Sequence, residues 1–368
     1  MRQGHLVCRR FADGIKMNLD QWLQPVRKVC QASRDEALLR QNQLIKPPGS
    51  LGELETWAIN FAGWQGQASP QLNNICLRVF AADHGVVAEG VSAFPQAVTA
   101  EMIRNFSHGG AAITVLAKQH AVDFKVINLG TAQPIEDLIH VDNLQLSNGS
   151  NNFCTQPALT DALLSECLTA GSHAVDPACQ LFIGGEMGIG NSTAAAALTS
   201  ALLCLSPDQT VGRGTGIDDS ALHRKLAAVR SALELHTKPG QSPMEYLRRL
   251  GGLEIAALAG AYIHAAQHGI PSLVDGFIAS AAALAACKIN PGARDWLLFA
   301  HCSAEYGHQQ LLEALQAKPI LDLKLRLGEG SGAALVIPLL KSALALHNGM
   351  ATFAEASVSN SSVNNRES

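Results

Sequence analysis

The 368-residue chain has few aromatic residues and lacks the common cysteine and histidine metal motifs. Aromatic residues make up 5% of the sequence, while alanine and glycine are abundant, so a layered α/β enzyme fits better than an all-β shell. The nine cysteines are odd in number and contain no C-x-x-C pair, which predicts reduced thiols and a cytoplasmic location. Because no H-E-x-x-H or similar ligand spacing occurs among the histidines, we predict no metal site.

Long apolar runs and concentrated basic segments are also missing. No run of about 18 apolar residues occurs, and the N-terminus lacks the apolar core of a signal peptide, so we predict no membrane span. The formal net charge is −4 without a basic stripe, which predicts no nucleic-acid partner. Hydrophobic residues make up 47% of the chain, which is enough for a large core. We therefore expect one large domain with an accessory piece.

Short apolar strand candidates alternate with helix candidates along the chain. The strands are predicted at residues 75–82, 124–129, 180–183, 272–274 and 296–300. The helices are predicted at residues 31–43, 160–172, 192–203, 251–266, 278–287 and 333–346, with a further helix starting near Asp218 or Asp219. This alternation predicts a doubly wound parallel sheet, with right-handed crossovers and a site along the C-terminal ends of the strands.

We also make structural predictions for several segments outside this alternation. Residues 1–16 form a short basic leader, so either it is a disordered extension or Met17 is the true start. The PPGSLGELE stretch is predicted to be a loop and helix start in which Ser50 and Glu53 form a capping box. Residues 132–157 are expected to form a long irregular excursion, and residues 357–368 a disordered tail.

The stretch RLGEGSGAAL places one carboxylate, Glu329, among glycines at the mouth of a long apolar helix. Glycines allow backbone angles and close approaches that side chains forbid, and the helix behind them anchors the loop. Glu329 is therefore a candidate catalytic residue. The alternative is a helix start whose acid only complements the helix dipole.

The segment GGEMGIGNST follows the third predicted strand and has the glycine spacing of a P-loop. Asn191 stands where the P-loop lysine would be, so the turn containing Gly188 and Gly190 is predicted to hold a small phosphate through backbone N–H groups. The alternative is a tight turn without a ligand. Because Glu186 would repel a phosphate beside it, we expect it to bind a sugar hydroxyl or a base.

A second glycine cluster, VGRGTGIDD, contains Gly212, Gly214 and Gly216 and precedes a helix that carries Lys225. Lys225 is a candidate charge partner for a phosphate at the neighbouring loop. The alternative is a solvated lysine on an ordinary surface helix.

Polar residues follow the first predicted strand, where open α/β sheets bind ligands. Asp83 stands directly after this strand, and Ser92, Phe94 and Gln96 lie in the loop that follows. An aromatic ring, a hydroxyl and an amide in one loop can bind a flat heterocycle. The alternative is a surface crossover in which Phe94 is buried.

Seven motifs in this order resemble one enzyme family. They are IKPPGSLGELE, FAADHGVVAEGVSAFPQAVT, GGEMGIGNST, VGRG with Lys225, LVDGF, HCSAE and RLGEGSGAAL. Together they resemble the nicotinate-nucleotide–dimethylbenzimidazole phosphoribosyltransferases of the cobalamin lower-ligand pathway. The resemblance covers the chain from about residue 20 to 358, and its seven motifs in order are highly specific.

The resemblance implies transfer of phosphoribose from nicotinate mononucleotide to 5,6-dimethylbenzimidazole, without a cofactor. It implies a homodimer with a large Rossmann-like domain at residues 66–334 and a small helical domain at residues 17–65 and 335–356. It further implies that Glu329 is the catalytic base, that Glu186 and Lys225 are charged site residues, and that the 188–191 and 212–216 segments face the phosphate. Ser92, Phe94 and Gln96 fall in its base-binding stretch.

Other classes of protein could carry some of the same motifs. A P-loop NTPase would need a lysine at position 191, and a transferase that uses phosphoribosyl pyrophosphate would carry two acids directly after a strand. A nucleotide-binding sensor without catalytic activity could keep the loops but would not need Glu329. A related transferase that uses another aromatic base remains an alternative.

Overall fold

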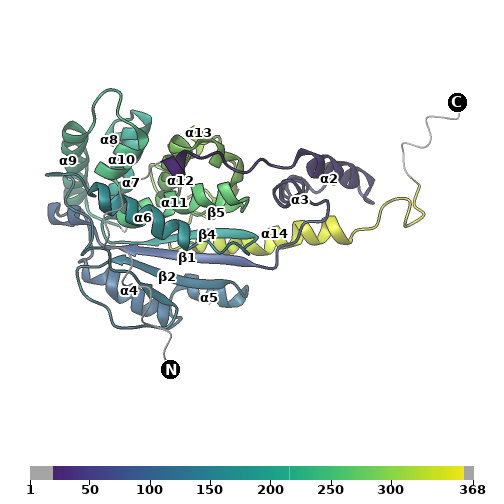
Figure 1. The fold of residues 1–368 in the computed structure, drawn as a ribbon, viewed down its shortest axis with the longest axis horizontal. Coiled ribbons are helices and arrows are strands. Elements are labelled where there is room, and N and C mark those ends of the chain that lie inside the picture. Colours follow the sequence, from purple (N-terminus) through teal and green to yellow (C-terminus); the bar gives the residue numbers. More distant parts are fainter. Residues whose placement is uncertain (1–19, 215, 360–368) are drawn as a thin grey trace.

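The computed structural model describes residues 20–214 and 216–359, which form a parallel sheet of seven strands covered by helices (Figure 1). The strands are β1 (Ile75–Ala82), β2 (Asp123–Gly130), β3 (Val141–Asn143), β4 (Leu181–Met187), β5 (Ser272–Val274), β6 (Leu297–His301) and β7 (Pro319–Leu321). Their order across the sheet is β3-β2-β1-β4-β5-β6-β7, so the strand order reverses between β1 and β4. This arrangement confirms the predicted α/β fold with a doubly wound parallel sheet.

Helices fill the segments between the strands and extend beyond them. The α-helices are α1 (Asp20–Leu23), α2 (Gln31–Gln43), α3 (Glu53–Gln65), α4 (Ala97–Ser107), α5 (Ala112–Gln119), α6 (Asp161–His173), α7 (Asn191–Leu203), α8 (Pro207–Thr210), α9 (Asp219–His236), α10 (Pro243–Leu250), α11 (Leu253–His268), α12 (Phe277–Ile289), α13 (His308–Ala314) and α14 (Ser331–Gly349). Two 3-10 helices, η1 (Gly85–Glu89) and η2 (Pro291–Trp296), complete the set for the described residues.

Strand β1 lies inside the sheet between β2 and β4 and is buried along its whole length, which explains why its sequence is apolar except for Arg78. Successive side chains of a strand point to opposite faces. Leu77 and Val79 therefore pack into the core under α4, α5 and α14, whereas Phe80 and Ala82 pack into the core under α6, α7, α11 and α12. Figure 1 shows α4 and α5 on the opposite side of β1 and β2 from α6 and α11.

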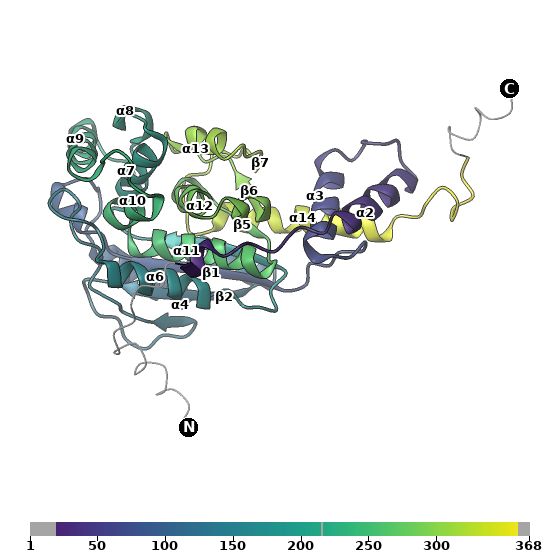
Figure 2. The same ribbon diagram turned by 45° about the horizontal axis from the view of Figure 1, so that its top comes forward.

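The helices α2 and α3 and the end of α14 form an arm that projects from the sheet (Figures 1 and 2). The Arg40 side chain on α2 donates hydrogen bonds to the backbone oxygens of His347, Asn348 and Met350 at 2.8 to 3.2 Å, which joins the two chain ends. The predicted boundary at residues 334 and 335 falls inside α14, so this helix belongs both to the body and to the arm. The division into two domains remains a proposal.

The predicted capping box of Ser50 and Glu53 is wrong. Gly52 is the N-cap residue of α3, with φ +54°, and no side chain caps the helix. The Glu55 side chain binds a backbone group just before the helix instead, because its Oε1 accepts a hydrogen bond from the backbone N–H of Leu51 at 3.0 Å. Ser50 lies too early in the turn to act as the cap.

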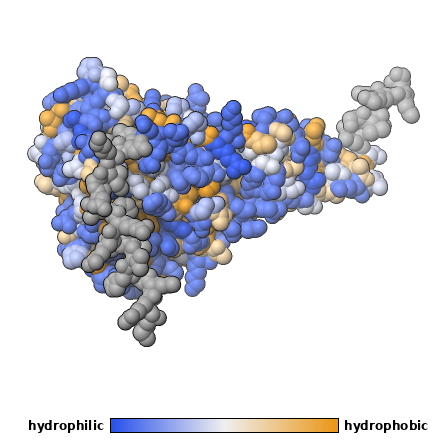
Figure 3. Space-filling model, in the orientation of Figure 1, coloured by the Kyte–Doolittle hydropathy of each residue, from blue (hydrophilic) through white to orange (hydrophobic). Residues whose placement is uncertain are grey.

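Other departures from the sequence predictions concern short elements and the chain ends. Two three-residue strands, β3 and β7, are additional to those predicted, and β3 lies within the expected irregular stretch. Residues 304–305 form a bend, and α13, which starts at His308, is additional to the predicted helices. The leader, Met17 and residues 360–368 lie outside the described residues. Hydrophilic residues cover most of the face shown in Figure 3, with apolar residues in scattered small groups.

Candidate active site

A cavity lies at the C-terminal ends of β4, β5 and β6, where the predicted topology places a site. It is lined by the end of β4 and the turn after it, by Gly214, and by residues 276–278, 301, 303, 305 and 326–329. A second cavity of about 540 Å³ adjoins it and shares Gly214, Glu305 and Arg326. We call these two adjoining cavities the cleft, and the larger one has the volume of a site for a small-molecule ligand.

Glu329 lines this cleft directly before α14 begins. Its backbone has φ +64°, an uncommon value for a residue other than glycine, and the flanking Gly328 and Gly330 both have φ +84°. The loop lies against β4 so closely that a Cβ on Gly185 would be 2.3 Å from the carbonyl oxygen of Glu329. The local sequence therefore needs its glycines both for the turn and for this contact.

The Glu329 carboxyl is almost completely buried, and its Oε2 has no hydrogen-bond partner among the described residues. Burial raises its pKa to about 7, the negative charge of Asp275 acts in the same direction, and the backbone N–H of Ile113 opposes both. A carboxyl group with a pKa near neutrality is suited to accept a proton. Leu327, the apolar residue two positions before Glu329, is 59% exposed, so it is not the main cause of the raised pKa.

Asp275 follows β5 and holds the loop that carries Glu329. Its two carboxylate oxygens accept hydrogen bonds from the backbone N–H groups of Gly330 at 3.2 Å and Ala333 at 2.8 Å, at the start of α14. The imidazole Nε2 of His301, the last residue of β6, lies 3.6 Å from Asp275 Oδ1. These contacts connect the ends of β5 and β6 to the start of α14 and fix the position of Glu329.

Glu186 lies near the end of β4 and lines the same cavity as Glu329. Burial, followed by the charges of Asp275 and Glu254, holds the pKa of Glu186 well above its usual range. The side-chain amide of Asn191 donates a hydrogen bond to Glu186 Oε2 and opposes this rise. A protonated Glu186 can donate a hydrogen bond into the cleft and does not place a second full charge beside Glu329.

The turn between β4 and α7 contains Gly188, Gly190 and Asn191, and Gly190 has φ +98°. Gly188 and Asn191 line the cavity, and the first N–H groups of α7 lie in the same turn. A buried hydrogen bond supports this turn from behind, because His84 Nε2 lies 2.7 Å from Glu254 Oε1 and the His84 side chain packs against Gly188 and Gly190. The turn therefore has the geometry of an anion site.

Lys225 on α9 does not line the cleft itself but lies behind the lining residues Ser192 and Gly214. The residue is only 2% exposed, and its ammonium group donates hydrogen bonds to Ser192 Oγ at 2.9 Å and to the carbonyl oxygen of Gly212 at 3.1 Å. Burial lowers its pKa to about 8, while the nearby Glu305 opposes this change. Lys225 is thus a buried cation that ties the two glycine-rich loops together, and it is not the solvated lysine of the alternative reading.

The structure does not bring every predicted site residue to this cavity. Asp83 does not line it, and its Oδ2 accepts a hydrogen bond from the backbone N–H of Ala132 at 2.8 Å, so no contact supports its predicted role in binding. Gln96 donates to the carbonyl oxygen of His84 at 2.8 Å, and the Ser92 hydroxyl accepts from the backbone N–H of Phe94 at 3.2 Å. Ser92, Phe94 and Gln96 do not line the cavity, and their roles stay predictions. The alternative of a buried Phe94 is wrong, since this residue is 47% exposed.

Four further residues at the cleft are additional to the predicted set: Asp275, His301, Glu305 and Arg326. The first three stand at or just after the ends of β5 and β6, and this position is a sequence signal for a site. Arg326 donates a hydrogen bond to the Gly214 carbonyl oxygen at 3.2 Å, and no local sequence signal marks it. Among the described residues, the one cluster with metal-ligand spacing lies at the opposite edge of the sheet. None of the helices in the described part of the chain is long and apolar enough to span a bilayer.

Comparison with known proteins identifies the family. A family model described as Phosphoribosyltransferase matches residues 26–358. The nicotinate-nucleotide–dimethylbenzimidazole phosphoribosyltransferase of Xanthomonas oryzae is 57% identical over 330 residues, covering 89% of this chain and 94% of the relative. The protein of that name from Pseudomonas aeruginosa is 55% identical over 347 residues, covering 93% of this chain and 99% of the relative.

Two solved structures from Thermus thermophilus are similar in fold. The crystal structure of CobT has a TM-score of 0.85 at 44% identity and covers 89% of this chain and 99% of its own. A structure of the nicotinate-nucleotide–dimethylbenzimidazole phosphoribosyltransferase from the same organism has a TM-score of 0.84 at 43% identity, covering 90% of this chain and 99% of its own. The chain therefore belongs to the nicotinate-nucleotide–dimethylbenzimidazole phosphoribosyltransferase family, in agreement with the seven motifs of its sequence.

Proposed function

We propose that the chain transfers phosphoribose from nicotinate mononucleotide to 5,6-dimethylbenzimidazole, giving α-ribazole 5′-phosphate and nicotinate. The observation that carries this proposal is Glu329, a buried carboxyl group with a pKa of about 7 in the wall of the cleft, in a chain that belongs to this enzyme family. A sensor that only binds nucleotides would gain nothing from a carboxyl group with a raised pKa at this position.

In the proposed reaction, Glu329 is the general base. The pyridinium nitrogen of nicotinate is a good leaving group, and it keeps the electron pair of its bond to C1′ when that bond breaks. One nitrogen of the benzimidazole forms the new bond to C1′ from the opposite face, which inverts the configuration from β to α. The other nitrogen gives up its proton, and the Glu329 carboxylate accepts it.

In this proposal, the other residues at the cleft bind either the phosphate or the sugar and base. We assign the phosphate to the turn with Gly188, Gly190 and Asn191, and to the positive charge of Lys225 beneath Gly214. Lys225 is protonated at neutral pH, since its pKa is about 8. Glu186, whose pKa is well above its usual range, then donates a hydrogen bond to a ribose hydroxyl or to the base.

For the acceptor base we propose the loop of Ser92, Phe94 and Gln96. The exposed ring of Phe94 is free to stack on a flat heterocycle, and the hydrogen bond from Gln96 to the His84 carbonyl holds the loop at the end of β1. The start of α4 also contacts the phosphate turn, since the Ile189 N–H donates to Thr99 Oγ1 at 3.1 Å. Asp83 acts in this scheme only by holding the loop after β2.

We also propose that the chain acts as a homodimer in the cytoplasm, with the arm of α2, α3 and the end of α14 as a separate small domain. Leu38 and Leu39 on α2 are 48% and 62% exposed, and together they offer an apolar contact for a second copy. The described cysteines are all free thiols, which fits a reducing compartment. Light scattering on the purified chain tests the dimer, and a monomer at micromolar concentration would contradict it.

The function is tested with the purified chain, nicotinate mononucleotide and 5,6-dimethylbenzimidazole. The proposal expects nicotinate to be released only when the base is present, with one α-ribazole 5′-phosphate formed for each nicotinate. Release of nicotinate at the same rate without the base would indicate a hydrolase. Binding of the nucleotide without any turnover would indicate a sensor.

A further inference from the structure

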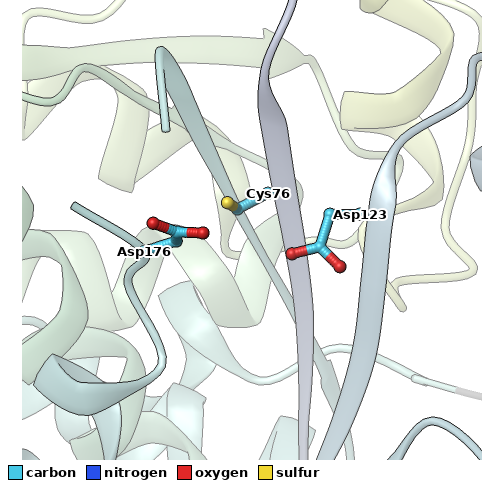
Figure 4. Close-up of side chains that lie close together, drawn as sticks. All are labelled: Cys76, Asp123 and Asp176. Atoms are coloured by element: carbon cyan, nitrogen blue, oxygen red, sulfur yellow. The ribbon is translucent and has the colours of Figure 1, made fainter. Parts of the chain in front are cut away.

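A second cluster of reactive side chains lies at the N-terminal edge of the sheet, where β1 and β2 begin and the chain enters β4. Cys76, Asp123 and Asp176 each offer one ligand atom there, and these atoms all lie within 4.8 Å of one another (Figure 4). Cys179 lies within hydrogen-bonding distance of Cys76, and all four residues line one cavity of about 270 Å³. The candidate active site lies at the opposite, C-terminal edge of the sheet.

The mixture of two sulfur and two oxygen ligands suits zinc, which binds four such ligands in a tetrahedron. Typical Zn–S and Zn–O bonds of about 2.3 and 2.1 Å place neighbouring ligand atoms roughly 3.5 Å apart, so the three atoms would need to approach by about 1 Å. Asp123 and Asp176 are exposed and can make this adjustment, while Cys76 and Cys179 are buried and fixed. We propose that Cys76, Asp123, Asp176 and Cys179 form a zinc site.

Arg78 holds one of these ligands in position. Its guanidinium pairs with Asp123 Oδ2 and donates to the Asp123 carbonyl oxygen at 2.7 Å, which leaves the other carboxylate oxygen for a metal. Outer partners of this kind orient metal ligands in known sites. The positive charge of Arg78 also offsets part of the negative charge that four anionic ligands bring together around Zn²⁺.

The thiols supply ligands by losing their protons. The Cys179 thiol lies 2.8 Å from the carbonyl oxygen of Leu181, to which it donates, and this bond is given up when the metal binds. Zn²⁺ replaces one proton on each cysteine, so two protons are released for each ion bound.

The site has a structural role in this proposal. Its ligands come from β1, β2 and the turn before β4, so one ion connects three segments that adjoin at the centre of the sheet. The four residues are far apart in the sequence except for Asp176 and Cys179, which is why no metal motif is visible and why the sequence predicts no metal site. Metal binding is expected to raise the melting temperature and to leave turnover unchanged.

Cobalt(II) is the probe, because cobalt bound by thiolate in a tetrahedral site gives a sulfur-to-metal charge-transfer band and intense visible bands. The full chain is freed of metal with a chelator and titrated with Co²⁺, and Zn²⁺ is then added to displace it. The matched variants are Cys76→Ser and Cys179→Ser, with Cys204→Ser as the control, since Cys204 is an exposed thiol outside the cluster. Turnover of each variant shows that it is folded.

The proposal expects the thiolate band to saturate at one Co²⁺ per chain and Zn²⁺ to abolish it. The band should be lost in Cys76→Ser and in Cys179→Ser and kept in Cys204→Ser. Asp176→Asn should weaken Co²⁺ binding at least tenfold while the chain keeps its turnover. A wild-type chain without the band, or a band that persists in either ligand variant, overturns the proposal.

Discussion

Replacing Glu329 by glutamine tests the base and the burial argument with one variant. Glutamine keeps the size and hydrogen-bonding shape of glutamate but cannot accept the proton, so turnover should fall by about 10²- to 10⁴-fold, the usual contribution of a positioned acid or base. Because Gly328, Gly330 and α14 are unchanged, both substrates should still bind. Steady-state kinetics with each substrate varied in turn separate these two effects.

The pH profile gives a second readout for the same variant. The Glu329 carboxyl must be ionised to accept a proton, and its pKa in the folded chain is about 7. The rate for the wild type should therefore rise with pH and level off above about pH 7, and this rising limb should vanish in Glu329→Gln. The limb is measured as kcat/KM with nicotinate mononucleotide as the varied substrate.

As the pH rises, the stability of the folded wild-type chain should fall while its activity rises. The pKa of Glu329 rises from its ordinary 4.5 to about 7 in the folded chain. At about 1.36 kcal/mol for each pKa unit, ionisation of this buried group destabilises the fold by on the order of 3 kcal/mol. The stabilising effect of its proton is fully present below pH 4.5 and is lost as the pH rises through 7. Glu329→Gln carries no charge, so at pH 8 it should be more stable than the wild type.

The control for these measurements is Glu234→Gln, an exposed glutamate on α9 that should alter neither turnover nor melting temperature. Chemical denaturation at pH 5 and pH 8 gives the stability difference between the variant and the wild type. The reasoning is refuted if Glu329→Gln turns over within a few-fold of the wild type, or if its stability difference from the wild type is the same at both pH values.

Three further predictions concern the surroundings of Glu329. In Asp275→Asn the loss of a neighbouring negative charge should move the rising limb of the pH profile to lower pH, and an unmoved limb would show that Asp275 does not tune Glu329. Lys225→Met should weaken binding of nicotinate mononucleotide about tenfold or more with a smaller effect on kcat, and the wild type should use nicotinate riboside poorly; equal use of riboside and nucleotide would remove Lys225 from the phosphate site. Gly185→Ala introduces a contact of 2.3 Å with the Glu329 backbone and should lower both kcat and melting temperature, whereas Gly349→Ala, with open space around it, should change neither.

The sequence predicts the main strands and helices well because their signals are local. β1, β5 and α2 lie at their predicted bounds, since each is a mostly apolar or mostly polar run that ends where the composition changes. The strands β3 and β7 have three residues each and lie at the two edges of the sheet, where their pairing depends on a neighbouring strand more than on their own composition. The cap of α3 depends on where the turn places Gly52, which the spacing of Ser50 and Glu53 does not reveal.

The candidate site is predictable only in part for a similar reason. Glu329 and the 188–191 turn stand out because glycine spacing and strand ends are visible in the sequence. The contacts of Asp275 with the start of α14, and the hydrogen bonds of Lys225 to Ser192 and Gly212, join residues that are distant in the chain. The raised pKa of Glu329 arises from this long-range packing and not from its neighbour Leu327.

The anomeric configuration of the ribosyl product tests the central claim most directly. A benzimidazole that attacks C1′ opposite the departing nicotinate, while its other nitrogen loses a proton to Glu329, must give the α product by inversion. Proton NMR of the C1′ signal after reaction of the purified chain with nicotinate mononucleotide and 5,6-dimethylbenzimidazole distinguishes the two anomers. The account predicts the α-ribosyl phosphate alone, formed in equal amount with nicotinate; a β product, or nicotinate release without a ribosylated base, would contradict it.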